Sequence, residues 1–201
     1  CLLAMATGTG KTRTIIGLMY RFLKAERFRR ILFLVDRTAL GDQAQDAFNE
    51  APLEGGMPLS KIYNVAELGD MAAEAETRVQ VATVQAMVRR IFASDAPPPL
   101  DAFDCIIVDE AHTCTQGGQG RQQRFQLLKG LAENPQRHMV LLTATPHSGD
   151  EAAFYNLLSL LDPAFVGLQS RTSADDPLRQ QLARHFVQRR RKDIVEWQAE
   201  T

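Results

Sequence analysis

Cysteine, tryptophan and long apolar runs are all scarce in this sequence. Its 201 residues include 3 cysteines and 1 tryptophan. The cysteines form no C-x-x-C pair and are odd in number, which argues against a disulfide framework or a zinc site and favours reduced thiols. No apolar stretch approaches the roughly 18 residues that a membrane-spanning helix needs, and no signal-peptide pattern opens the chain. We therefore expect a cytoplasmic protein with no membrane partner.

An excess of charge of either sign is also lacking. The chain has 23 Lys and Arg against 24 Asp and Glu, for a formal net charge of -1. Bulk electrostatics would not bring such a chain to nucleic acid, so any binding must come from local patches. With 45% hydrophobic residues the composition is that of one globular domain. The chain begins at Cys1 and enters an apolar stretch at once, which is typical of a piece of a longer protein.

Short apolar runs alternate with longer amphipathic stretches, a pattern typical of an α/β fold with an open, mostly parallel sheet and helices on both faces. The strands are expected at Leu2–Met5, Ile31–Val35, Lys61–Asn64, Val79–Thr83, Cys105–Val108 and Met139–Leu142. The helices are expected at Thr12–Glu26, Thr38–Asn49, Val84–Phe92, Arg121–Glu133 and Glu151–Leu161. We predict one lobe over residues 1–165, and over 166–201 a polar lead-out that contains a helix near 177–186 and the basic run 189–192.

The strongest local signal is a glycine-rich turn between the first strand and the first helix: Thr7, Gly8, Thr9, Gly10, Lys11 and Thr12. Glycines allow successive N–H groups to face phosphate oxygens, and the helix N-terminus adds its positive dipole end. Lys11 would reach the β and γ phosphates of ATP, and the Thr12 hydroxyl would be a ligand to Mg²⁺. Met5 occupies the position where the strict pattern has glycine. The alternative is a strand-to-helix turn that binds nothing.

Two carboxylates follow the buried strand Cys105–Val108 directly. Asp109 and Glu110 open the run Asp-Glu-Ala-His, which ends at His112. Ligands of open α/β sheets bind at the carboxyl ends of the strands. Asp109 would therefore hold Mg²⁺, and Glu110 would orient and deprotonate the attacking water. His112 would link the nucleotide site to the next motif. The alternative is a solvated acidic turn.

Hydroxyl groups follow the strand Met139–Leu142, in the run Thr143-Ala144-Thr145-Pro146. Thr143 and Thr145 could bond His112 or Glu110 and pass on the state of the nucleotide; the alternative is an ordinary turn before a proline. Polar residues at two further strand ends are candidates for contacts to a nucleic-acid backbone: Arg37, Thr38, Thr83 and Gln85. The run 189–192 could also bind phosphate, although such a run is usually a solvated face.

The ordered set TGTGKT, VDRTAL, TVQ, VDEAH and LTATP resembles the first RecA-like lobe of superfamily 2 helicases and DNA translocases, over about residues 1–165. Residues 1–110 resemble the motor subunit of type I restriction enzymes, and residues 109–201 resemble Swi/Snf-type translocases of bacterial phage-defence systems. Both resemblances imply an ATP-driven motor on double-stranded DNA. The chain has no upstream glutamine motif and no second RecA-like lobe with its Q-x-x-G-R-x-x-R motif, which would supply an arginine finger.

Two hypotheses follow from these motifs. The first is the ATP-binding and ATP-hydrolysing lobe of a DEAH-type DNA translocase in a restriction or phage-defence complex, which pairs with a second RecA-like lobe. The second is a truncated module that binds nucleotide or DNA without turnover. A P-loop kinase or a GTPase would need a lid of arginines or an N-K-x-D motif, and the sequence has neither. RNA remains open as a substrate, because backbone contacts carry little sequence information.

Overall fold

A computed structural model describes residues 1–36, 38–66, 76–93, 101, 103–115, 119–144, 151–171, 173 and 175–193, with the backbone alone for residues 38–41, 119 and 121. The chain divides into two compact units. Unit 1 comprises Cys1–Thr9, Glu110–Pro135 and Met139–Thr201, and unit 2 comprises Gly10–Asp109 and Gln136–His138. The chain passes between them at four bonds: Thr9 to Gly10, Asp109 to Glu110, Pro135 to Gln136 and His138 to Met139.

Unit 2 is built on four strands in the order β3-β4-β2-β5. Their bounds are Val65–Ala66 for β3, Val79–Thr83 for β4, Ile31–Val35 for β2 and Cys105–Val108 for β5. All three pairings are parallel, and Ile31 of β2 is aligned with both Val79 and Cys105. Every residue of β2, β4 and β5 is buried, as expected when both faces of a parallel sheet are covered.

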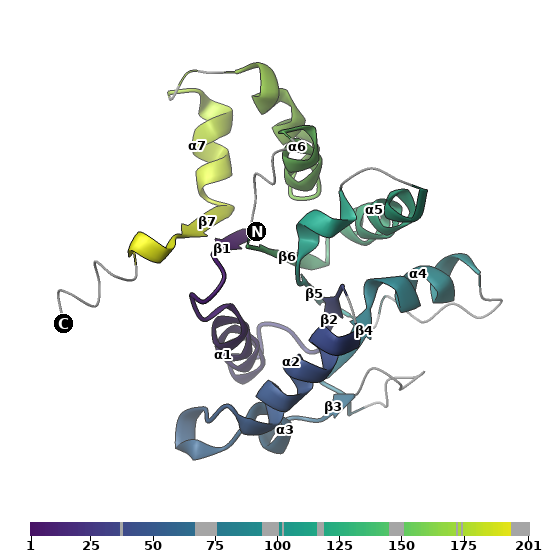
Figure 1. Cartoon of the computed structure of the whole chain (residues 1–201), viewed down its shortest axis with the longest axis vertical. Helices are drawn as coiled ribbons and strands as arrows, with labels where there is room; N and C mark the ends of the chain where they lie inside the picture. Colours follow the sequence, from purple (N-terminus) through teal and green to yellow (C-terminus); the bar gives the residue numbers. More distant parts are fainter. Residues whose placement is uncertain are drawn as a thin grey trace. The chain divides into compact units, whose positions relative to one another are not determined.

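Helix α1 (Lys11–Lys24) precedes β2, and the other helices of unit 2 lie between its strands in the chain (Figure 1): α2 (Thr38–Glu50), η1 (Glu54–Gly56), α3 (Leu59–Ile62) and α4 (Val84–Phe92). Helix α1 buries a stripe at helical spacing, formed by Ile15, Ile16, Met19 and Leu23. The basic residues Arg21 and Lys24 lie in its last turn, where they complement the helix dipole. The first residue of this helix is therefore held in place by a packed core.

The strand predicted at Lys61–Asn64 is wrong, because residues 59–62 form the single helical turn α3 and the strand begins at Val65. Pro58 stands directly before the turn, where its fixed φ of -75° suits a helix start. The backbone N–H of Tyr63 donates to the carbonyl of Leu59 at 2.9 Å, and the Leu59 side chain is fully buried. Burial of one leucine on a helical turn thus outweighs the strand preference of Ile62 and Tyr63.

Unit 1 contains the strand order β6-β1-β7, with bounds Leu2–Met5 for β1 and Phe186–Arg189 for β7. Strand β6 spans His138–Thr143, and its residues 141–143 pair with β1 in parallel. The helices of unit 1 are η3 (Ala111–Cys114), α5 (Gln119–Ala132), α6 (Glu151–Ser159), η4 (Pro163–Ser170) and α7 (Pro177–Ala183). Its core includes Phe165, Leu168 and Leu158.

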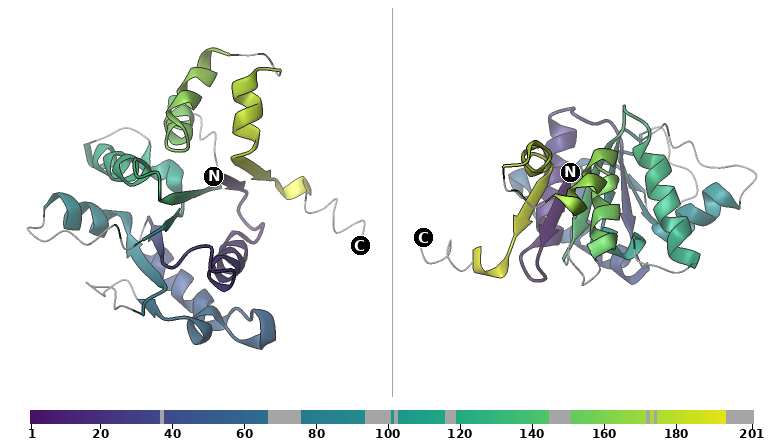
Figure 2. Two further views of the ribbon diagram at one scale, coloured as in Figure 1. Left: turned by 180° about the vertical axis from the view of Figure 1, so that it is seen from behind. Right: turned by 90° about the horizontal axis from the view of Figure 1, so that it is seen from above.

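Strand β7 lies in the segment predicted as a polar lead-out. It pairs in parallel with β1 and runs beside it (Figure 2), with Leu2 aligned to Phe186 and Met5 to Arg189. Helix α7 accordingly ends at Ala183 rather than near Phe186. Most of β7 is exposed, so its composition lacks the apolar run that marks a buried strand. Backbone hydrogen bonds to β1 hold it instead.

The predicted α/β class with a parallel sheet is confirmed. Strands β1, β2, β4 and β5 have the predicted bounds, and the predicted strand Met139–Leu142 lies within β6. No helix formed by the described residues is long and apolar enough to cross a bilayer.

Candidate nucleotide-binding site

The part of the predicted site that belongs to unit 2 joins a helix start to a strand end. Lys11 is the first residue of α1, and Asp109 directly follows β5. The Lys11 Nζ lies 3.0 Å from Asp109 Oδ1, and the two side chains are 20% and 16% exposed. The backbone N–H of Asp109 donates to the carbonyl of Leu34 in β2 at 2.8 Å. An ammonium group and a carboxylate are therefore held together at the carboxyl end of two parallel strands.

The glycines of the phosphate loop adopt the left-handed conformation that the predicted turn requires. Gly8 has φ +82° and Gly10 has φ +81°. A Cβ atom built on either glycine would meet nothing within 4 Å, so the need for glycine is conformational rather than spatial. Thr9 closes the turn, because its N–H and its hydroxyl both donate to the carbonyl of Ala6, at 3.1 and 2.7 Å.

The exposed loop residues remain accessible for a ligand. Thr7, Gly8, Gly10 and Thr12 are exposed, whereas Thr9 is buried. Gly10 is the N-cap of α1 and no side chain caps this helix start. Free N–H groups at a helix start favour an anion. The Thr12 hydroxyl and the Asp109 carboxylate are oxygen ligands of the kind that Mg²⁺ prefers, and Mg²⁺ sites commonly use one or two protein groups together with phosphate oxygens.

The part of the site in unit 1 is a short chain of polar contacts. Glu110 Oε2 lies 3.4 Å from His112 Nδ1, and the same nitrogen lies 3.0 Å from the Thr143 hydroxyl oxygen. Thr143 is fully buried at the end of β6. The structure thus brings together the acidic run and the first hydroxyl of the Thr-Ala-Thr run.

Glu110 itself has a strained backbone. Its φ of +48° and ψ of +44° lie in the left-handed region, which costs a residue with a side chain roughly 1–2 kcal/mol. It is one of only two non-glycine residues with positive φ in the described chain. Such outliers cluster at functional sites, where the surrounding structure enforces a side-chain direction.

Arg191 contacts the phosphate loop and was not identified from the sequence as a site residue. Its Nε donates to the carbonyl of Thr7 at 3.1 Å. The parallel pairing of β7 with β1 produces this contact, since Ala6 N–H donates to the carbonyl of Arg189 at 3.1 Å. The basic run 189–192 is visible in the sequence. Its contact with the phosphate loop cannot be read from the sequence, because that contact depends on the pairing of β7 with β1.

The predicted nucleic-acid contacts are described only in part. Arg37 and Thr145 lie outside the described residues, and so does the side chain of Thr38. The Thr83 side chain is buried and accepts a hydrogen bond from the N–H of Ala86 at 3.1 Å, so it caps helix α4. Gln85 is exposed in the first turn of α4.

Solved structures similar to this chain define the class of protein. The SWI2/SNF2 ATPase core of Sulfolobus solfataricus, solved in complex with double-stranded DNA, has a TM-score of 0.58 and 16% identity, and it covers 94% of this chain and 39% of that chain. The Pyrococcus furiosus Hef helicase domain has a TM-score of 0.56 and 25% identity, over 80% of this chain and 32% of that chain. The fold is that of a RecA-like helicase lobe.

The family follows from the sequence match. Residues 1–148 match the family described as type III restriction enzyme, res subunit, and the chain belongs to that family. The chain is also 51% identical over 111 residues to the type I restriction enzyme EcoKI endonuclease subunit of Escherichia coli strain K12. That match covers 55% of this chain and 9% of the EcoKI subunit. The protein is thus an N-terminal helicase lobe of the restriction-enzyme type, and the predicted resemblance to the type I motor subunit is confirmed.

Proposed function

We propose that this chain is the ATP-binding and ATP-hydrolysing lobe of a DEAH-type translocase that moves on double-stranded DNA. The observation that carries the proposal is the contact of 3.0 Å between Lys11 and Asp109. It pairs the start of the helix that follows a glycine-rich loop with the carboxylate that follows a buried strand. Phosphoryl transfer needs these two groups near each other, one for the phosphates and one for the metal.

Each residue has a separate role in the proposed chemistry. Lys11 binds the β and γ phosphates, and the exposed N–H groups of the loop and of the α1 start bind phosphate oxygens. Thr12 and Asp109 would hold Mg²⁺, which would neutralise charge on the phosphates. Glu110 orients the attacking water and accepts its proton. Lys11 and Asp109 exchange their mutual contact for these new partners when nucleotide binds.

The contacts of His112 support a coupling role. Its Nδ1 lies near both the Glu110 carboxylate and the Thr143 hydroxyl, at 3.4 and 3.0 Å. A change in the partner of Glu110 would therefore alter the contact of His112 with Thr143 at the end of β6. We propose that Thr143, together with Thr145, passes the nucleotide state to the bound DNA through this contact.

The proposed partners rest on the relatives. The Sulfolobus structure is described as a complex with double-stranded DNA, and the EcoKI relative is a restriction enzyme subunit. We propose that this chain likewise acts on duplex DNA, with a second RecA-like lobe, within a restriction complex that serves in phage defence. Arg37, Thr38 and Gln85 are the proposed backbone contacts, and Thr83 supports them by capping α4.

A second candidate function is a module that binds nucleotide or DNA without turnover. The chain spans 39% and 32% of the two helicase structures that it resembles. An arginine finger from a second lobe is worth roughly 10³ to 10⁵ in rate in related enzymes.

The test is Mg²⁺-dependent ATP turnover by the purified chain, with and without duplex DNA, beside Lys11→Ala. Turnover that DNA stimulates and that Lys11→Ala abolishes supports the motor lobe. ATP binding that Lys11→Ala abolishes, without turnover above that variant, supports the binding module. Equal ATP binding by both proteins contradicts the motor lobe and a nucleotide-binding module.

A further inference from the structure

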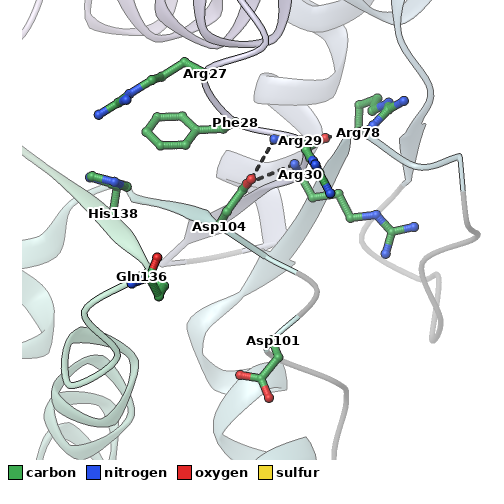
Figure 3. Close-up of a pocket in the computed structure, with 9 residues that line it drawn as sticks. All are labelled: Arg27, Phe28, Arg29, Arg30, Arg78, Asp101, Asp104, Gln136 and His138. Carbon is green, nitrogen blue, oxygen red and sulfur yellow. Dashed lines mark hydrogen bonds between the residues drawn. The ribbon is translucent and has the colours of Figure 1, made fainter.

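An arginine-rich pocket lies in unit 2 at the amino ends of its strands. The cavity has a volume of about 630 Å³. Its lining includes Arg27, Phe28, Arg29 and Arg30, which lead into β2, and Arg78, which leads into β4. Figure 3 shows Asp104 in the middle of the pocket, with Phe28 and His138 to one side and Arg30 and Arg78 to the other.

The carboxylates of this pocket are already engaged within the protein. Asp104 accepts hydrogen bonds from the backbone N–H groups of Arg29 and Arg30, at 2.7 and 3.0 Å. Asp101 lies 3.4 Å from the guanidinium group of Arg137, which is not part of the lining. Both carboxylates keep their negative charge, but the lining has four arginines against these two groups, so the pocket keeps an excess of positive charge.

Three of the arginines keep their charge available. Arg27, Arg29 and Arg78 are exposed, and none forms an ion pair with another residue of the described chain. The Arg27 guanidinium lies 5.8 Å from the centre of the Phe28 ring. An Arg78 nitrogen donates to the carbonyl of Arg29 at 3.4 Å. The pocket therefore presents several guanidinium groups with unused donors.

The Phe28 ring at the pocket is largely buried against other rings. Phe28 is 7% exposed, and its ring packs against Phe22 at 4.9 Å and His138 at 5.0 Å between ring centres. This packing fixes the backbone that carries the arginines. An interface with a protein usually needs an exposed apolar core, and the buried ring offers none. A purely electrostatic ligand fits the pocket better than a peptide does.

This surface is separate from the candidate nucleotide site. Strands β2 and β5 are parallel, and Ile31 is aligned with Cys105. Arg30 and Asp104 therefore precede the two strands, whereas Asp109 follows β5 at its other end. A strand of four residues spans roughly 13 Å. Charge changes at the pocket should thus leave nucleotide binding intact.

We propose that this pocket, defined by Arg27, Arg29 and Arg78 around Asp104, is a second binding surface for the phosphate backbone of duplex DNA. The guanidinium fork matches phosphate geometry, and contacts to backbone phosphates need no apolar surface. The proposal rests on the proposed function for its choice of DNA as the polyanion. It adds a contact at the strand ends opposite to the nucleotide site.

The test compares Arg27→Gln/Arg29→Gln/Arg78→Gln with the unsubstituted chain in binding a duplex of random sequence from 50 to 200 mM salt. Each lost phosphate contact reduces the slope of log affinity against log salt by about 0.9, so the triple variant should lose about 2 to 3. The matched control, Lys61→Gln/Arg89→Gln/Arg184→Gln, removes the same charge from exposed positions outside the pocket and should keep the slope. Arg29→Lys should also keep it.

Several outcomes would overturn the proposal. They are an unchanged slope in the pocket variant, an equal loss of slope in the control variant, or no duplex binding by the unsubstituted chain. Melting curves establish that each variant is folded. Lys11-dependent ATP turnover is measured in parallel. If the chain hydrolyses ATP but the pocket variant has the same salt slope as the unsubstituted chain, only the pocket proposal is refuted. If the chain does not hydrolyse ATP but the pocket variant has a reduced slope, only the motor function is refuted.

Discussion

The contact between Lys11 and Asp109 predicts a measurable coupling energy in the protein without nucleotide. At a separation of 3.0 Å, Coulomb's law with an effective dielectric constant of about 20 gives roughly 5.5 kcal/mol before any cost is subtracted. Desolvation and the ordering of two side chains offset most of this attraction. Exposed pairs retain roughly 0.2–1 kcal/mol, and these side chains are only 20% and 16% exposed. We therefore expect about 1–2 kcal/mol.

The assay is a double-mutant cycle with Lys11→Met, Asp109→Asn and the double variant, unfolded by urea without Mg²⁺ or nucleotide. The exposed pair of Lys24 and Glu54 serves as the control and should give a smaller coupling energy. That pair still holds the pKa of Glu54 below its ordinary value through the hydrogen bond from Lys24. A coupling energy below about 0.3 kcal/mol for Lys11 and Asp109 would refute the reasoning.

Three further predictions concern single residues. Thr83→Ala should lower the free energy of unfolding by about 1 kcal/mol in urea titrations, because the N–H of Ala86 loses its cap, whereas Thr83→Ser should restore most of it; equal stability of both variants would count against capping. Burial raises the pKa of the Cys105 thiol to about 12, so iodoacetamide at pH 8 should label exposed Cys1 well before Cys105, as mass spectrometry of peptides can determine. Gly10→Ala should cost roughly 1–2 kcal/mol because φ is +81° there, and a variant as stable as the parent in thermal melts would show that the loop does not need glycine.

The raised pKa of Cys105 also sets the sign with which the free energy of unfolding depends on pH. The folded pKa of Cys105 lies above that of a free thiol, near 8.5, so only the unfolded chain ionises as the pH first rises past that value. This contribution to stability is complete below about pH 8.5 and is lost progressively as the pH rises toward 12. Cys105→Ala should remove this part of the pH dependence in urea titrations.

Much of the fold could be predicted because its buried strands are short segments rich in apolar and β-branched residues. Strands β2, β4 and β5 are buried at every residue, so composition alone marks their bounds. The phosphate loop could be predicted because two glycines flank a threonine before Lys11, and the structure gives both glycines positive φ. Both features depend on short local stretches of sequence, so they can be predicted without knowledge of distant contacts.

The remaining features depend on partners distant in sequence. Strand β7 is mostly exposed and is held by backbone bonds to β1, more than 180 residues earlier, so no local pattern marks it. The contact of Arg191 with Thr7 follows from that pairing. The turn α3 depends on the burial of Leu59. The side chains of residues 61–64 suggest a strand instead, so the turn could not be predicted from that stretch. The predicted lobe boundary at residue 165 stays a prediction.

Equilibrium binding of ATP to the purified chain, measured by calorimetry with and without Mg²⁺, tests the candidate nucleotide site most directly. We expect one site, at least about 10-fold weaker binding by Lys11→Ala under both conditions, and loss of the Mg²⁺ enhancement in Asp109→Asn. Asp109→Asn should bind ATP without Mg²⁺ at least as tightly as the parent, because Lys11 is released from its partner. Binding that both substitutions leave unchanged would contradict the account.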